Sequence, residues 1–173
     1  YKSHIISNYF SNGSSLGLNI SYDKGPISWN TNRRLYNARS KIKKNFFLIY
    51  SDNFVNYPFE EIRKLHLKEK KPLTLFLCKK NKGNLKLNRN LNIIEHDNSR
   101  KKKNFNYVEI GYMVASKYKL FSYIKKDNSD FSSIFINLIK DNNLGSLISG
   151  ENYHSISDLK RLKKTKEFFK KKK

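Results

Sequence analysis

The sequence predicts an α/β protein, a three-layer α/β/α sandwich with a mostly parallel central sheet and a small hairpin insertion. Apolar runs of strand length, at residues 46–50 and 73–78, alternate along the chain with segments of helical periodicity. Strands that alternate with helices build a parallel sheet that is covered on both faces. The chain has 173 residues, which suits one domain with a substantial core.

Helices are expected where apolar residues recur every three or four positions. Thr31 can cap a helix in which Leu35 and Ala38 share a face, and Ser157 with Asp158 can open the last helix. The expected helices are, in order, residues 2–10, one opened by Thr31, one with Pro58 in its first turn, residues 117–124, residues 131–139 and one opened by Ser157.

Strands are expected where apolar and polar residues alternate or where a short apolar run lies between turn residues. The expected strands are residues 16–22, 46–50, 73–78, 107–115 and 145–149, with a hairpin in residues 79–94 that turns around residues 81–84 and is followed by a shorter turn.

Asp52 is the first candidate for a functional residue. It follows the apolar run at residues 46–50, which predicts a strand buried on both faces. Open α/β sheets bind ligands just beyond the carboxyl ends of such strands, so a catalytic or metal-binding carboxylate belongs at this position. An aspartate after a strand also serves as a turn former or helix cap, and position alone favours neither interpretation.

The chain is strongly basic, with 36 Lys+Arg against 14 Asp+Glu and a formal net charge of +22. Such a charge is typical of proteins that bind nucleic acid. The cations are spread along the whole chain, however, and abundant Asn with scarce Ala indicates an A/T-rich coding sequence, which raises Lys everywhere. We therefore expect no specific nucleic-acid partner.

Several other classes of function lack their usual signals. Cys78 is the single cysteine, so no disulfide can form within the chain, and the four histidines have no metal-ligand spacing. No apolar stretch approaches the length of a membrane span and no signal peptide is visible, so we expect a cytoplasmic protein without a membrane partner.

Four segments, in this order, resemble the sugar-1-phosphate nucleotidyltransferases, in particular the branch that handles mannose- or heptose-type phosphates. They are residues 4–22 with Gly13 and Gly17, Thr-Asn-Arg-Arg-Leu at 31–35 followed by Phe-Leu-Ile-Tyr-Ser-Asp at 47–52, Tyr-Val-Glu-Ile-Gly-Tyr at 107–112, and Tyr-His-Ser-Ile-Ser-Asp-Leu-Lys-Arg-Leu at 153–162. The resemblance implies a Rossmann-like nucleotidyltransferase fold. It also implies an enzyme that joins an NTP to a sugar 1-phosphate, releases pyrophosphate and forms an NDP-sugar.

The resemblance also implies roles for individual residues. Asp52 matches the aspartate that binds Mg²⁺, the expected cofactor, and is the expected catalytic residue. Thr31, Asn53, Glu109 and Gly111 match substrate-binding positions, Thr31 near the nucleotide and Glu109 with Gly111 in the sugar pocket. For Gly111, close packing against a neighbouring strand is an equally good explanation. A homo-oligomer is compatible with the family.

The sequence departs from the family pattern at three places. The Gly-rich nucleotide-binding loop is missing, so we expect residues 1–169 to be a partial domain, inactive alone, followed by a basic tail at 170–173. Ser155 stands where the second metal-binding aspartate is expected; either Glu151 or Asp158 compensates, or one carboxylate suffices, or activity is impaired. The family's sugar-phosphate lysine has no counterpart beside Glu95. The basic run at residues 100–103 either replaces that lysine or, as we favour, is a solvated loop.

Two alternatives to the enzyme stay open. One is a non-catalytic domain of the same fold that binds a nucleotide sugar or has a regulatory role, which Ser155 favours. The other is a basic nucleic-acid-binding module, which only the net charge favours.

Overall fold

The structure is a computed structural model that describes residues 2–55, 59–127, 129–150 and 152–171. The described strands are β1 (Asn45–Ile49), β2 (Asn53–Phe54), β3 (Leu73–Lys79), β4 (Leu85–Leu87), β5 (Ile93–His96), β6 (Tyr107–Ser116), β7 (Leu144–Ser149) and β8 (His154–Ser155). Six of these form the central sheet in the order β5-β4-β6-β3-β7, with β1 also paired to β6. β2 and β8 form a separate two-stranded ladder.

The central sheet is mixed and mostly antiparallel, so the prediction of a mostly parallel sheet is wrong. Among the described strands, β3 and β7 are the one parallel pair, while β6 runs antiparallel to β1, β3 and β4. Along the chain, β6 follows the β4–β5 hairpin and not a crossover helix. In the sheet it lies between β1 and β3. β1 and β3 therefore point the same way without being neighbours.

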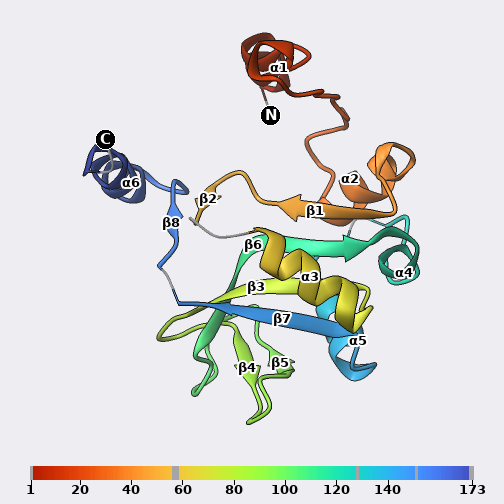
Figure 1. The fold of residues 1–173 in the computed structure, drawn as a ribbon, viewed down its shortest axis with the longest axis vertical. Helices are drawn as coiled ribbons and strands as arrows, with labels where there is room; N and C mark the ends of the chain where they lie inside the picture. Colours follow the sequence, from red (N-terminus) through yellow and green to blue (C-terminus); the bar gives the residue numbers. More distant parts are fainter. Residues whose placement is uncertain (1, 56–58, 128, 151, 172–173) are drawn as a thin grey trace.

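Helices cover both faces of the sheet, as Figure 1 shows, which agrees with the predicted α/β class and layering. The described helices are α1 (Ser3–Phe10), α2 (Thr31–Ala38), α3 (Phe59–Glu69), α4 (Lys117–Phe121), α5 (Ser133–Lys140) and α6 (Leu159–Lys171), with short 3₁₀ turns at Ser14–Leu16 and Arg39–Lys41. α3 packs on one face, and α2, α4 and α5 contribute to the core on the other. α1 and α6 lie at the periphery (Figure 1).

β3 is the centre of the core because both of its faces are covered. Leu73, Leu75 and Leu77 belong to the larger apolar cluster with α4 and α5, whereas Phe76 and Cys78 belong to the cluster with α3. Successive side chains of a strand point to opposite faces, so a strand between two helical layers is apolar throughout. The apolar run at residues 73–78 is predicted correctly for this reason.

The strand predicted at residues 46–50 exists, but it is not buried on both faces. β1 pairs with β6 alone in the described part of the chain, and its residues alternate between exposed and half-buried. Phe47 is 40% exposed and Ile49 is 45% exposed. Burial within the described part of the chain therefore does not by itself explain why this strand is so apolar.

Two predictions for the first thirty residues fail in different ways. Residues 16–22 alternate like a strand, yet they have no strand to pair with, and the described chain there is a 3₁₀ turn followed by irregular structure. The helix predicted at residues 2–10 is present as α1, but it has no buried residue. Periodicity predicts an element and not the surface that covers it.

Three smaller predictions concern the hairpin, the end of the chain and Pro58. The hairpin consists of β4 and β5 and turns after Leu87 rather than at residues 81–84, because β6 lies between β3 and β4. Lys170 and Lys171, the first two residues of the expected basic tail, are helical and continue α6. Pro58 lies outside the described residues.

Candidate active site

The carboxyl end of β1 meets β2, β6, β8 and the start of α6 around a polar cavity of about 160 Å³, which we call the site cavity. Its lining residues are Tyr50, Asp52, Asn53, Arg100, Val108, Glu109, Gly111, Tyr153, Ser155, Ser157 and Arg161. The structure thus brings together five positions singled out from the sequence, namely Asp52, Asn53, Glu109, Gly111 and Ser155.

Asp52 lies on the turn that leads from β1 to β2. The Tyr50 backbone N–H donates to the Gly111 carbonyl at 2.8 Å, which extends the β1–β6 ladder one residue beyond β1. The chain then turns at Ser51 and Asp52, and the Ile156 N–H donates to the Asp52 carbonyl at 2.8 Å. These bonds hold the turn between β6 and the chain just after β8, so that Asp52 borders the cavity.

Asn53 fixes β2 in place. Its side-chain amide donates to the Ile110 carbonyl at 3.0 Å, and the Tyr112 hydroxyl donates to the Asn53 carbonyl at 2.9 Å. In the β2–β8 ladder Asn53 is paired with Ser155. Asn53 therefore positions Ser155 near Asp52, and at least one of its amide hydrogens is already committed within the protein.

Gly111 is required by backbone geometry. Its φ of +75° lies in the left-handed region, and a Cβ at this position would come within 2.6 Å of the Tyr50 Cβ. Its N–H donates to Glu109 Oε2 at 2.8 Å. The Tyr50 side chain therefore comes close to Gly111, as expected if this glycine is needed for packing against a neighbouring strand.

Burial makes negative charge costly in this cavity. Desolvation raises the pKa of Glu109, and the nearby Asp52 adds to the rise, while the Gly111 N–H and Arg100 oppose it. Desolvation also raises the pKa of Tyr50, with Glu109 and Asp52 adding to it, so its hydroxyl keeps its proton and can donate. Asp52 itself is exposed, so a ligand that brings a cation or hydroxyl donors would relieve mainly the cost of the Glu109 carboxylate.

Arg100 reaches the cavity from a loop that Asp97 organises. The Asp97 carboxylate accepts hydrogen bonds from the hydroxyl and backbone N–H of Ser99 and from the backbone N–H groups of Lys101 and Lys102. These bonds lower the pKa of Asp97 to about 2, with the Ser99 hydroxyl as the largest cause. The basic run at residues 100–103 is exposed, in agreement with the solvated loop that we favoured, and its first residue, Arg100, also borders the cavity.

Asp158, one of the two positions proposed to compensate for Ser155, does not line the described cavity. Ser155 is 8% exposed, and its hydroxyl donates to Ser157 Oγ at 3.1 Å. Asp158 instead accepts from the Arg161 backbone N–H at 2.8 Å and forms an ion pair with the Arg161 side chain at 3.3 Å. Asp158 thereby caps α6, and Glu151 lies outside the described residues.

Thr31 is the one predicted site residue that the described cavity does not include. It is exposed at the first position of α2. The neighbouring Asn32 is buried, and its amide donates to Ser129 Oγ at 2.7 Å. α2 is therefore held against the loop before α5 rather than against the cavity.

A metal ion could be held here by few protein ligands. No group of three or more His, Cys, Asp or Glu that could hold a metal occurs among the described residues. The site cavity does supply the hard oxygens of Asp52 and Glu109, and Mg²⁺ commonly takes one or two carboxylates together with water and substrate phosphate. The donor set fits Mg²⁺ bound in that way.

Sequence analysis assigned no catalytic or binding role to Tyr50, Tyr153, Ser157 or Arg161, which also line the cavity. All four belong to the motifs that carry the family resemblance, so a signal was present. The sequence does not reveal that the β2–β8 ladder brings the motif at residues 47–52 next to the motif at residues 153–162, because each strand of this ladder has only two residues.

Comparison with solved structures supports the fold, whereas comparison of the sequence with known families and proteins identifies no relative. No family model and no curated protein matches the sequence. Among solved structures, a Bacillus anthracis protein described as a glucose-1-phosphate thymidylyltransferase, in complex with sucrose, is similar with a TM-score of 0.84 and 14% identity, over 95% of this chain and 71% of that one. HddC from Yersinia pseudotuberculosis is similar with a TM-score of 0.74 and 14% identity, over 98% of this chain and 75% of that one.

HddC complexed with GMP-PN gives a TM-score of 0.77 at 13% identity, over 98% of this chain and 75% of that one. The fold of the chain is therefore that of the sugar nucleotidyltransferases, as the resemblance implies.

None of the described helices is long and apolar enough to cross a membrane.

Proposed function

We propose that this chain is the greater part of a sugar-1-phosphate nucleotidyltransferase, which transfers a nucleotidyl group from an NTP to a sugar 1-phosphate. The observation that supports this most directly is the site cavity, where Asp52, Glu109, Gly111 and Ser155 come together from three separate segments. Each occupies a position of a family motif, with Ser155 in place of the expected aspartate, and the fold is the one that these enzymes share. Because the reaction consumes an NTP, we propose a cytoplasmic location.

The cavity offers complementary groups for the two halves of a sugar phosphate. Carboxylates accept hydrogen bonds from sugar hydroxyls, and the half-buried Glu109 is placed for that role. Guanidinium groups bind phosphate with paired N–H donors, and Arg100 and Arg161 border the same cavity. Tyr50 keeps its proton and can donate one further hydrogen bond.

In the proposed reaction an oxygen of the sugar phosphate attacks the α-phosphorus of the NTP. A new P–O bond forms, the bond from the α-phosphorus to the bridging oxygen breaks, and pyrophosphate leaves. Chemistry of this kind depends mainly on positioning and on neutralising charge. Asp52 is the residue that would hold Mg²⁺, whose charge would balance that of the phosphates when bound.

A non-catalytic domain that binds a nucleotide sugar is the second candidate, and Ser155 favours it. A serine hydroxyl is a weaker ligand for Mg²⁺ than the carboxylate that the family pattern has at this position. Such a domain would bind the product of the reaction without making it.

The proposed function is tested by measuring pyrophosphate release by the full-length gene product. GTP is the first nucleotide to test, since HddC was solved with GMP-PN, and mannose- and heptose-type 1-phosphates are the first sugars. We expect Asp52→Asn to lower the rate about 100-fold or more. The control is Glu167→Gln, which removes one exposed carboxylate from α6. Full activity in Asp52→Asn would refute the mechanism, and NDP-sugar binding without turnover would favour the second candidate.

Ser155→Asp tests whether this position is a vacated metal site. Ser155 is paired with Asn53, next to Asp52, so a carboxylate there would add a second hard oxygen. We expect the Mg²⁺ concentration for half-maximal pyrophosphate release to fall. An unchanged midpoint would mean that residue 155 does not contact the metal.

A further inference from the structure

A second, larger cleft lies beside the site cavity and differs from it in charge. Its volume is about 310 Å³, and it is bounded by the end of β3, by β8 and by α6. It shares Tyr153, Ser155 and Arg161 with the site cavity. Ligand pockets commonly have volumes of about 300–1,000 Å³, so the cleft is large enough for a small organic anion.

Cations from two distant segments converge on this cleft. Lys79 and Lys80 come from the end of β3, and Arg161 and Lys164 come from α6. Arg161 and Lys164 are three residues apart, which puts them on one face of the helix. The described lining contains no carboxylate, although Asp158, just outside it, pairs with Arg161. We call this region the basic cleft.

Two of these cations are held by neighbouring groups. Lys80 Nζ donates to the Tyr153 hydroxyl at 2.9 Å, and the same Nζ lies 5.2 Å from the centre of the Tyr153 ring. Arg161 Nη1 donates to Ser157 Oγ at 3.1 Å. Tyr153 and Arg161 thus border both cavities, and they connect the basic cleft to the site cavity.

We propose that the basic cleft binds the dianion of a phosphate monoester. Convergent cations repel one another, and an anion among them removes that repulsion and gains charge-assisted hydrogen bonds. A phosphate dianion matches both the charge of the cleft and its Lys and Arg donors. The phosphate has two sources in principle: a second phosphate group on the sugar substrate, or a free phosphate compound that binds next to the active site. This proposal concerns binding and does not require that the chain be catalytic.

The experiment titrates the protein with inorganic phosphate, glucose 1-phosphate and glucose 1,6-bisphosphate by calorimetry in 0.15 M salt. Lys80→Gln and Lys164→Gln remove one charge each from the basic cleft. Lys163→Gln is the matched control, because it removes the same charge from the same helix at an exposed position that does not line the cleft. Melting temperatures of the three variants check that each is folded.

Inorganic phosphate is expected to bind, and Lys80→Gln and Lys164→Gln are each expected to weaken its binding about five- to tenfold, with Lys163→Gln within about twofold of the parent. If the bisphosphate binds more tightly than glucose 1-phosphate, and the two cleft variants abolish that margin, the source is a second phosphate on the sugar. Without such a margin, the source is a free phosphate compound.

Two results would overturn the proposal. One is equal weakening in all three variants, which would mean a general effect of net charge. The other is the absence of binding by both inorganic phosphate and the bisphosphate. Neither readout involves pyrophosphate release, so a failure here is distinguishable from a failure of the proposed function.

Discussion

Glu109 and Gly111 show how the site cavity is built at the scale of single residues. The two lie two positions apart on β6, and the Gly111 N–H donates to the Glu109 carboxylate. The positive φ of Gly111 lets the strand pass close to Tyr50, while Glu109 stays in a desolvated position with a raised pKa. Protein stability and ligand binding therefore oppose each other here, because the partly desolvated carboxylate of the half-buried Glu109 costs free energy until a ligand contacts it.

Glu109→Gln is expected to change the pH dependence of stability. In the parent, the folded state binds the Glu109 proton more tightly than the unfolded state does, so the free energy of unfolding falls as pH rises through the raised pKa. The variant lacks this loss, and its stability relative to the parent should rise as pH increases above the ordinary pKa of a glutamate, about 4. Urea denaturation across that range measures it.

Glu60→Gln is the control for this experiment, since it should show the opposite trend. The hydrogen bond from Arg63 lowers the pKa of Glu60, so the parent gains stability as pH rises and the variant loses that gain. Parallel pH curves for the parent and Glu109→Gln would contradict the raised pKa of Glu109.

Gly111→Ala is expected to destabilise the protein by about 2 kcal/mol or more. The added Cβ would lie 2.6 Å from the Tyr50 Cβ, at a backbone conformation that alanine rarely adopts. Chemical denaturation measures the free energy of unfolding. Gly150→Ala is the control, because its Cβ would enter open space, and a change within about 0.5 kcal/mol is expected for it. Equal stability of the two variants would contradict this account of Gly111.

At the scale of elements, the site depends on a very short ladder. β2 and β8 pair through two residues each, and such a ladder is marginal by itself. α6 supports it: Thr165 Oγ1 donates to the Ser155 carbonyl at 3.0 Å, and the ring of His154 stacks on Phe168 with 3.8 Å between centroids. The position of Ser155 beside Asp52 therefore depends on α6.

Thr165→Val is expected to loosen β8. Valine has nearly the shape of threonine but cannot donate, so the Ser155 carbonyl loses a partner at a cost of about 1–3 kcal/mol. Amides of residues 153–157 should then exchange with solvent about tenfold faster or more in hydrogen-exchange experiments. Thr165→Ser keeps the hydroxyl and should exchange like the parent. Identical exchange in the valine variant would show that the bond does not hold β8.

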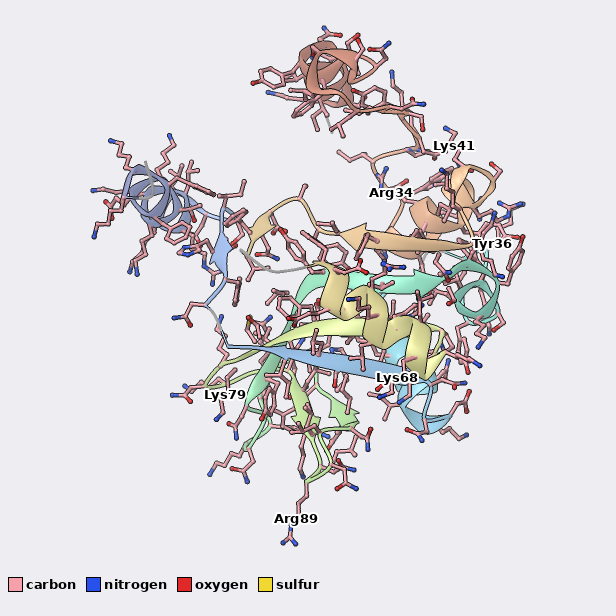
Figure 2. The ribbon with its side chains drawn as sticks, in the orientation of Figure 1. Arg34, Tyr36, Lys41, Lys68, Lys79 and Arg89 are labelled. Atoms are coloured by element: carbon pink, nitrogen blue, oxygen red, sulfur yellow. The ribbon has the colours of Figure 1, made fainter. Side chains whose placement is uncertain are left out.

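At the scale of the whole molecule, the formal net charge of +22 is distributed rather than concentrated. Figure 2 labels, among others, Arg34, Lys41, Lys68 and Arg89, whose side chains lie in widely separated parts of the structure. Scattered cations attract polyanions without reading a sequence.

Binding to nucleic acid is therefore expected to be weak and unselective. Two DNA duplexes of equal length and unrelated sequence should bind with equal affinity, and both affinities should fall steeply as salt increases. Fluorescence anisotropy at several salt concentrations measures this. Selective nanomolar binding to one sequence at physiological salt would restore the interpretation as a nucleic-acid-binding module.

The sequence by itself determined the local elements and the residues that later met in one cavity. The apolar run at residues 73–78 predicted the strand β3, helical periodicity predicted α3, and a turn after β1 was one of the two interpretations of Asp52. These features depend on neighbours within a few residues, and local propensity and periodicity report them directly.

Only the tertiary structure decided the rest. The insertion of β6 between β1 and β3 made the sheet mostly antiparallel, and the two-residue β2–β8 ladder brought Ser155 beside Asp52. The loop around Asp97 placed Arg100 at the cavity, and the exposure of α1 left an apolar face without cover in the described chain. Each of these depends on contacts between residues far apart in sequence, and no local pattern specifies which distant strand or loop will be the partner.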